Sequence, residues 1–327
     1  MPVLAFGTSP FHFKGADGAG FVNSVVAPGA GVAVSAMSIT TGGDDKAWLE
    51  FAAQSEIWAT CYTGRNTTAA GNFMIFRSGT TNVLRVTVPT STTIRVDYWD
   101  GAAWQELIAA QTLWSNTPVK RIDIHLKLDD TTGAFELKVD GAAPLLSFAG
   151  DTILNGISTI DRLYLGSYGG GGVGYFINLM VADEDASEWI AIDLATAANG
   201  NYTAWTGDEA AIDDRGNNYA ATEADLIYSQ AADERESFTG SAIAASYDTG
   251  WDVIAVGVLA QARRTGAGGN LALFCRSGST DADAAAETLA ATWSGYQKFF
   301  ATDPATAAAW ATVNTAEAAQ IGVKSTA

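Results

Sequence analysis

The chain has 327 residues, of which 48% are hydrophobic and 17% charged, a composition that supports folded cores and excludes a disordered protein. Its formal net charge is −18, with −8 in residues 1–190 and −10 in residues 191–327. An acidic surface repels phosphate, so nucleic acid is excluded as an expected partner. No apolar run approaches the ~18 residues of a membrane span, so we expect no membrane insertion.

At about 150 residues per domain, the length favours two domains. Residues 1–35 are rich in Gly, Ala and Val and predict an N-terminal arm or an opening strand. Residues 36–188 hold many short segments of alternating polarity, separated by turn residues, which is typical of a β-sandwich. Within them, Asp100-Gly101 between VDYW and AAWQEL predicts a tight hairpin turn.

The stretch Ile122–Gly141, IDIHLKLDDTTGAFELKVDG, has the clearest pattern. Apolar residues alternate with polar ones on both sides of the turn DDTTG, which predicts a β-hairpin. Asp123 and His125 share the polar face, and an Asp beside a His suggests a catalytic pair. The charges around them favour an ordinary solvated sheet surface instead, and we expect no catalytic residues here.

Near residues 183–200 the pattern shifts, and residues 189–327 predict a second β-sandwich domain. We expect GAGGN (266–270) to close a hairpin between the flanking strands, a short helix or turn in the Ala-rich stretch after it, and a strand at the IGVK ending. The segments NFMIFRSGTT (72–81) and NLALFCRSGST (270–280) resemble each other. Either the two domains are related, or a strand and a common turn recur by chance.

Side chains that bind metals are few. The chain has two histidines and two cysteines, too few for a common zinc site. His12 lies between two phenylalanines near the N-terminus and is expected to be an anchor or a partly buried residue, not a ligand. Cys61 and Cys275 stand in apolar contexts and are expected to be small buried residues; their spacing gives a disulfide no support.

A calcium site at the loops of the sandwich is the open alternative, because calcium needs oxygen ligands only. The candidate acidic clusters are Asp44-Asp45, Asp129-Asp130, Asp183-Glu184-Asp185 and Asp213-Asp214. None has EF-hand spacing, and the alternative is that each is an ordinary solvated acidic loop. The run Gly169–Gly172 is no phosphate loop, because neither Lys-Ser/Thr nor a helix start follows it.

Four aromatic residues in or beside turns are the candidate glycan-binding residues: Trp99, Trp104, Trp114 and Tyr168. Exposed aromatic faces stack on sugar rings, although Trp and Tyr are also frequent at the rims of ordinary sandwiches. No motif singles out the paired carboxylates of a glycoside hydrolase.

Two resemblances follow from these segments. The stretch up to about residue 185, with the hairpin at 122–141, GDTILNGISTIDRLYLGS and GYFINLMVADED, resembles a concanavalin A-like or laminin-G-like jelly roll. The segment from Asp303 to Trp310, with the Gly-containing final strand after it, resembles a pattern of virion proteins of tailed bacteriophages, prophages and gene transfer agents. Together they imply an all-β chain of two jelly-roll sandwiches in a non-enzymatic head spike, decoration or tail fibre.

The second resemblance also implies partners and location. The expected partners are other virion proteins of the capsid or tail, a host cell-surface glycan and, as an open alternative, further copies of the chain. Particles of this kind assemble in the bacterial cytoplasm and leave by lysis, so the chain would lie on the particle surface. The absence of a signal-peptide pattern and the few cysteines fit assembly there. The alternatives are a polysaccharide-degrading jelly-roll enzyme and a structural capsid cement protein.

Overall fold

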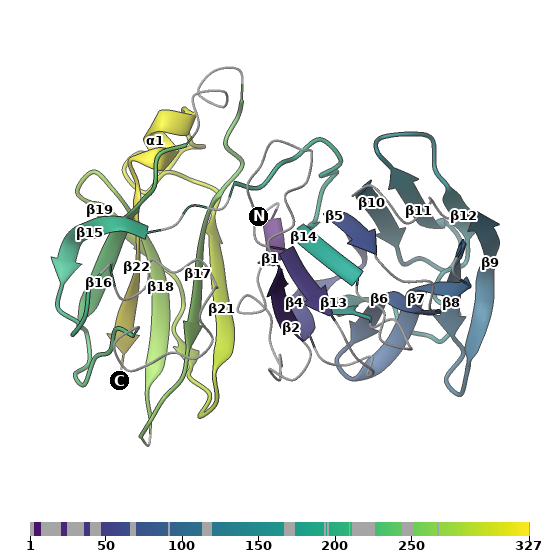
Figure 1. Cartoon of the computed structure of the whole chain (residues 1–327), viewed down its shortest axis with the longest axis horizontal. Coiled ribbons are helices and arrows are strands. Elements are labelled where there is room, and N and C mark those ends of the chain that lie inside the picture. Colours follow the sequence, from purple (N-terminus) through teal and green to yellow (C-terminus); the bar gives the residue numbers. More distant parts are fainter. Residues whose placement is uncertain are drawn as a thin grey trace. The chain divides into compact units, whose positions relative to one another are not determined.

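The computed structural model describes most of the chain. The described residues are 3–7, 21–24, 36–39, 47–65, 70–90, 92–112, 120–166, 174–192, 194, 196–208, 210, 226–243, 251–266 and 268–326. They form antiparallel strands and a single five-residue helix, so the chain is all-β, as the sequence predicts (Figure 1). No helix within these ranges is long and apolar enough to span a membrane.

The strands divide between two compact units, Pro2–Ala191 and Ile192–Ala327. In the first unit an eight-stranded sheet has the order β12-β11-β10-β5-β14-β3-β2, with β1 beside β14. Its strands are β1 Val3–Gly7, β2 Phe21–Ser24, β3 Ala36–Ile39, β5 Glu56–Arg65, β10 Lys120–Lys127, β11 Gly133–Val139, β12 Leu146–Gly150 and β14 Gly174–Ala182.

A six-stranded sheet completes the first unit, in the order β4-β13-β6-β7-β8-β9. Its strands are β4 Ala47–Gln54, β6 Gly71–Ser78, β7 Thr81–Thr90, β8 Thr93–Trp99, β9 Trp104–Thr112 and β13 Ile160–Leu165. Inward side chains of both sheets form one core: Ile124 and Leu126 from β10 pack with Leu84 and Val86 from β7. This is the sandwich that the alternating pattern predicts.

The hairpin predicted at 122–141 is confirmed. Strands β10 and β11 pair antiparallel, with His125 opposite Glu136, and Ile122, Ile124 and Leu126 are buried on the core side. The expectation of a solvated polar face is wrong for Asp123, which is only 7% exposed. It accepts hydrogen bonds from Thr60 Oγ1 at 2.8 Å and Arg121 Nε at 2.9 Å, and such partners are what make a buried carboxylate tolerable.

The second unit has its own sheets and its own core. A six-stranded sheet has the order β15-β16-β22-β18-β19 with β20 beside β18, and β17 pairs with β21 in a separate two-stranded sheet. The elements are β15 Thr196–Thr203, β16 Arg235–Gly240, β17 Val256–Ala262, β18 Asn270–Ser277, β19 Thr280–Asp283, β20 Glu287–Thr288, β21 Ser294–Phe300, α1 Val313–Glu317 and β22 Gln320–Thr326. Val258, Leu273 and Phe300 pack together in its core.

The predicted hairpin around GAGGN is wrong. Strand β17 pairs with β21, whereas β18 pairs with β19, β20 and β22, so the Gly-rich loop joins two different sheets. Alternation identifies strands but not their partners, and a Gly-rich loop suits a crossing as well as a hairpin. The predicted helix and final strand are present as α1 and β22.

The Asp303–Trp310 segment has a structural role. Asp303, 4% exposed, accepts the Ala305 N–H on its side chain at 2.9 Å, which holds a tight turn. Trp310 is buried in the core and donates its Nε1–H to the Phe300 carbonyl at 2.8 Å. An indole buried in this way anchors the loop to β21.

The two similar segments form the same kind of hairpin, one in each unit. Gly79 and Gly278 have φ of +56° and +57° in the turns that follow Ser78 and Ser277. The arginine before each turn donates to the side chain five residues later: Arg77 to Asn82 and Arg276 to Asp281, both at 2.7 Å.

Candidate functional site

The outer face of the six-stranded sheet in the first unit carries an unusual set of side chains. On β7, Leu84 and Val86 point into the core, so Arg85 between them points outward. The strand register places Arg85 opposite Asp97 on β8, and Asp97 opposite Glu106 on β9. Three neighbouring strands therefore contribute one charged side chain each to a single row.

Asp97 is the centre of this row. Its side chain is fully buried, and Arg85 contacts Oδ2 through Nε at 2.8 Å and Nη2 at 2.7 Å. Arg95 approaches Oδ1 with Nε at 2.8 Å, as an ion pair rather than an aligned hydrogen bond. Both carboxylate oxygens are thus engaged, so Asp97 fixes two guanidinium groups and has no oxygen turned toward a substrate.

Two tryptophans lie beside the charged row. Trp99 and Trp104 are opposite each other at the end of the β8–β9 hairpin, with ring centroids 5.3 Å apart and planes at 69°. The Arg85 guanidinium carbon lies 4.5 Å from the centroid of Trp104. We name the set Arg85, Arg95, Asp97, Trp99, Trp104 and Glu106 the arginine–tryptophan face.

The predicted Asp100-Gly101 turn sets the position of this face, and it is confirmed. Asp100 Oδ1 accepts the N–H groups of Ala102 at 2.8 Å and Ala103 at 2.7 Å, and these hydrogen bonds lower the pKa of the Asp100 carboxyl. Gly101 has a φ of +100°, a conformation that favours glycine. The turn fixes the register that brings Trp99 and Trp104 together.

The same sheet continues the pattern on its other strands. Arg77 lies over the Tyr164 ring at 4.2 Å, and Tyr164 stacks on Trp48 with centroids 5.2 Å apart. Arg162 on β13 pairs with Glu50 on β4 at 3.0 Å. Guanidinium groups held against aromatic rings thus recur across this sheet.

Of the four predicted glycan-binding residues, the structure brings Trp99 and Trp104 into contact, and Trp114 and Tyr168 lie outside the described residues. Sequence reasoning missed Arg85, Arg95 and Asp97. A signal was present, because Arg95 and Asp97 alternate with apolar residues on a strand that ends at a predicted turn. Their partner Arg85 depends on the register between β7 and β8, which the sequence does not show.

The Asp123 and His125 pair of the opposite sheet does not form a catalytic arrangement. His125 stacks on Trp58, with centroids 4.5 Å apart and planes at 12°, and its Nε2 lies 2.8 Å from Glu56 Oε1. Asp123 faces Arg121 and Thr60 instead. Their partners explain Asp123 as a buried group of the sheet and His125 as part of its surface.

The acidic clusters give no metal site among the residues described. No group of three or more His, Cys, Asp or Glu side chains there is close enough to hold a metal ion. Asp129 caps its own turn by accepting the N–H groups of Thr131 and Thr132, which hold its pKa well below the ordinary range. Asp44, Asp45, Asp213, Asp214, His12 and Gly169–Gly172 lie outside the described ranges.

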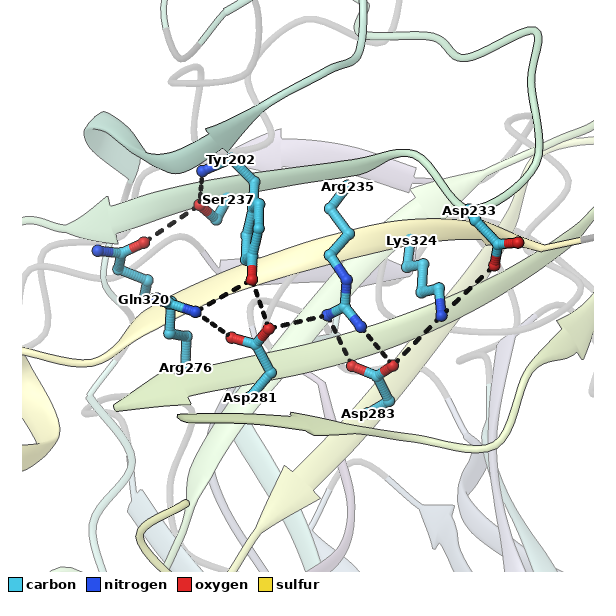
Figure 2. A network of polar contacts seen from close by, with 9 residues as sticks. All are labelled: Tyr202, Asp233, Arg235, Ser237, Arg276, Asp281, Asp283, Gln320 and Lys324. Carbon is cyan, nitrogen blue, oxygen red and sulfur yellow. Dashed lines mark hydrogen bonds and ion pairs between the residues drawn. The ribbon is translucent and has the colours of Figure 1, made fainter. Parts of the chain in front are cut away.

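The second unit carries another polar network on the outer face of its larger sheet (Figure 2). Arg235 forms a two-pronged contact with Asp283 at 2.8 and 2.7 Å, and Arg276 contacts Asp281 at 2.7 Å. Tyr202 donates its hydroxyl to Asp281 at 2.6 Å. Figure 2 shows Lys324 reaching both Asp283 and Asp233, each at 3.5 Å.

One contact of this network lies where the backbone pairing of β15 and β16 is irregular. The β15–β16 register is interrupted between Asn199 and Thr203, and Tyr202 N–H donates to Ser237 Oγ at 3.0 Å instead. A Cβ on Gly200 would lie 2.4 Å from that same oxygen, so a larger residue there would force the Ser237 side chain to move. The Figure 2 network is therefore explained as a set of side-chain contacts that join neighbouring strands of the sheet.

Glu236 lies on the other face of β16 and is fully buried. Its Oε2 accepts the Trp205 N–H at 3.0 Å, and Oε1 has no partner among the described groups. Burial raises the pKa of this carboxyl.

No family model matches the chain, and no curated protein matches it either. Solved structures of similar fold include the globular domain of T. cruzi calreticulin, with 12% identity over 57% of this chain and 89% of that chain and a TM-score of 0.41. A Caenorhabditis elegans galectin has 12% identity, coverages of 50% and 95% and a TM-score of 0.29. The carbohydrate recognition domain of Emp46p has 9% identity, coverages of 46% and 79% and a TM-score of 0.32.

Carbohydrate-binding domains are thus among the structures of similar fold. Their TM-scores below 0.5 carry no argument about what this chain binds, since one fold serves many functions.

Proposed function

We propose that the first unit binds carbohydrate through the arginine–tryptophan face, and that the chain attaches a phage-like particle to the polysaccharide of a host cell. The observation that carries the binding part is the Arg85–Asp97–Arg95 cluster beside Trp99 and Trp104. Sugars present hydroxyl groups at the rim of a ring and C–H groups on its face. A site for them combines fixed polar groups with an aromatic surface.

The arginines supply fixed donors. A guanidinium carries five N–H groups in a rigid plane, and Asp97 holds Arg85 and Arg95 from below. Their side chains keep 18% and 31% exposure, so part of each group reaches solvent. Because both are already oriented, less rotamer entropy is lost when a ligand binds.

The tryptophans supply the apolar surface. Trp99 and Trp104 are half-buried at the end of a rigid hairpin. Arg85 stacks on Trp104 and links the indole to the charged row. A sugar lying along β8 and β9 would contact both kinds of group at once.

The particle part of the proposal is supported by the sequence resemblance at Asp303–Trp310. Because Trp310 and Asp303 have structural roles, the segment speaks for a shared fold and not for a shared binding site. Attachment also suits a site that binds weakly, because many copies on one particle convert weak single contacts into strong binding through avidity.

A glycan array with the purified full chain tests the binding part. We expect wild-type protein to bind a defined set of glycans and Arg85→Gln to lose at least about tenfold in affinity, the loss of one charge-assisted contact. Lys138→Gln is the matched control, because it removes the same charge from the other sheet. Equal binding by both variants would place the site elsewhere, and no binding at all would reject the proposal.

Two further readouts separate the alternatives. Release of new chain ends from a bound polysaccharide would indicate the polysaccharide-degrading enzyme. Labelled protein that stains bacterial cells, and loses staining when their capsule is removed, would reject a structural cement protein. Attachment predicts staining without chain cleavage.

A further inference from the structure

We infer that the ligand of the arginine–tryptophan face is an acidic polysaccharide whose sugars carry carboxylate groups. This inference rests on the proposed carbohydrate binding and names the class of sugar. It follows from how the charges of the face are layered, from the weakness of one ion pair, and from a contrast with the second unit.

In the cluster around Asp97 the two arginines lie outside the carboxylate that they share. The Asp97 side chain is 0% exposed, whereas those of Arg85 and Arg95 are 18% and 31% exposed. A ligand that approaches β7 and β8 therefore meets guanidinium groups and not the carboxylate beneath them. Guanidinium matches a carboxylate in a planar, two-pronged geometry, which favours an acidic sugar over a neutral one.

Glu106 is the one acid of the face that faces solvent, with 51% exposure. Its Oε2 lies 3.5 Å from Arg95 Nη1, and such an exposed, long pair is weak in water. A ligand carboxylate can take the place of Glu106 on Arg95 at little cost. Glu106 then acts as a competitor whose removal improves binding of an acidic ligand.

The charge of this sheet face also differs from that of the chain as a whole. Within a chain of net charge −18, this sheet face gathers four arginines on four adjacent strands, Arg77, Arg85, Arg95 and Arg162, beside the acids Glu50, Asp97 and Glu106 that pair with three of them. A polyanion is repelled by an acidic surface and attracted to a cationic one. An acidic polysaccharide would therefore be directed to this face.

The Figure 2 network has the opposite layering. Asp281 and Asp283 are 19% and 33% exposed, while Arg276 and Arg235 are 12% and 19% exposed. Neither of these carboxylates is fully buried beneath its arginines, as Asp97 is beneath Arg85 and Arg95. A fully buried acid under two more exposed arginines therefore distinguishes the arginine–tryptophan face from this Arg–Asp cluster.

The test uses the full chain with polygalacturonate, alginate and polysialic acid, each beside its carboxyl-reduced, neutral form, in affinity electrophoresis. We expect at least one acidic polymer to bind about tenfold more tightly than its neutral form, the value of one charge-assisted contact. Arg95→Gln should weaken that binding by about tenfold, and Glu106→Gln should strengthen it. Lys127→Gln and Glu136→Gln, on the other sheet, are the matched charge controls and should have little effect.

The outcomes are distinct. Equal binding of acidic and neutral forms, or effects of the control variants as large as those of Arg95→Gln and Glu106→Gln, would overturn the inference and leave carbohydrate binding standing. Binding of no polymer, acidic or neutral, together with a blank glycan array would overturn both. Tighter binding of the acidic form with opposite effects of Arg95→Gln and Glu106→Gln supports the inference.

Discussion

Arg85 lies over the indole of Trp104, with the guanidinium carbon 4.5 Å from the ring centroid, while the same guanidinium holds the buried Asp97. One side chain thus joins the ion cluster to the aromatic pair. The pairing has consequences for both binding and stability.

Replacing Trp104 by Ala removes the stack on Arg85 and the contact with Trp99. We expect glycan affinity to fall by about tenfold or more, because stacking and the orientation of Arg85 are lost together. Affinity electrophoresis on the array-identified glycan measures this. Trp58→Ala, which removes a half-buried indole stacked on His125 in the other sheet, should lose stability without losing affinity.

Asp97→Asn should destabilise the first unit by about 3–5 kcal/mol, because it leaves two partly buried guanidinium groups without their carboxylate. Urea unfolding followed by tryptophan fluorescence gives the free energy. Glu136→Gln removes a carboxylate from a surface pair 3.6 Å long and should change it by less than about 1 kcal/mol. Similar losses in both variants would mean that Asp97 is not the centre of the cluster.

Glu236 should make the second unit less stable as the pH rises. Burial raises the pKa of Glu236 in the folded protein above the ordinary value of 4.5. The protonated carboxyl therefore contributes its full stability below the unfolded pKa, and this stability is lost as the pH rises through the folded pKa and the buried group becomes charged. Glu236→Gln, which resembles the neutral acid, should raise the free energy of unfolding at neutral pH and flatten this decline. A variant less stable than wild type at every pH would contradict the account.

Both thiols should be unreactive in the folded protein. Cys61 and Cys275 are free and buried; burial raises the pKa of the Cys61 thiol and raises that of Cys275 to about 12. Because the thiolate is the reactive form, Ellman's reagent should label neither residue under native conditions and both in denaturant. Rapid native labelling of one thiol would show that its unit opens locally.

The sequence predicts local features of this fold better than distant ones. The hairpin at 122–141 and the turn at Asp100-Gly101 depend on alternation and turn chemistry within one short stretch, and both are confirmed. The predicted hairpin at GAGGN is wrong because strand partners depend on the whole sheet. Tertiary pairing, which single-sequence patterns do not contain, decides such cases.

The candidate site shows the same limit. Its two tryptophans, Trp99 and Trp104, are predictable because they flank a turn, and the turn brings them into contact. Arg85 and Asp97 lie 12 residues apart, so their meeting depends on the β7–β8 register, which is irregular farther along the same pair of strands. The burial of Asp123 is missed in the same way. Its partner Thr60 is 63 residues away in the chain, so the local pattern around Asp123 does not show their contact.

The two Arg-Ser-Gly hairpins have a consequence for how the chain assembles. In each, the turn glycine, the arginine and the side chain that it contacts lie within a few consecutive residues. Contacts this local close quickly, because little chain entropy is lost in making them. We therefore expect each unit to form its own hairpin early, and the first unit to begin folding on the ribosome before the second has been synthesised.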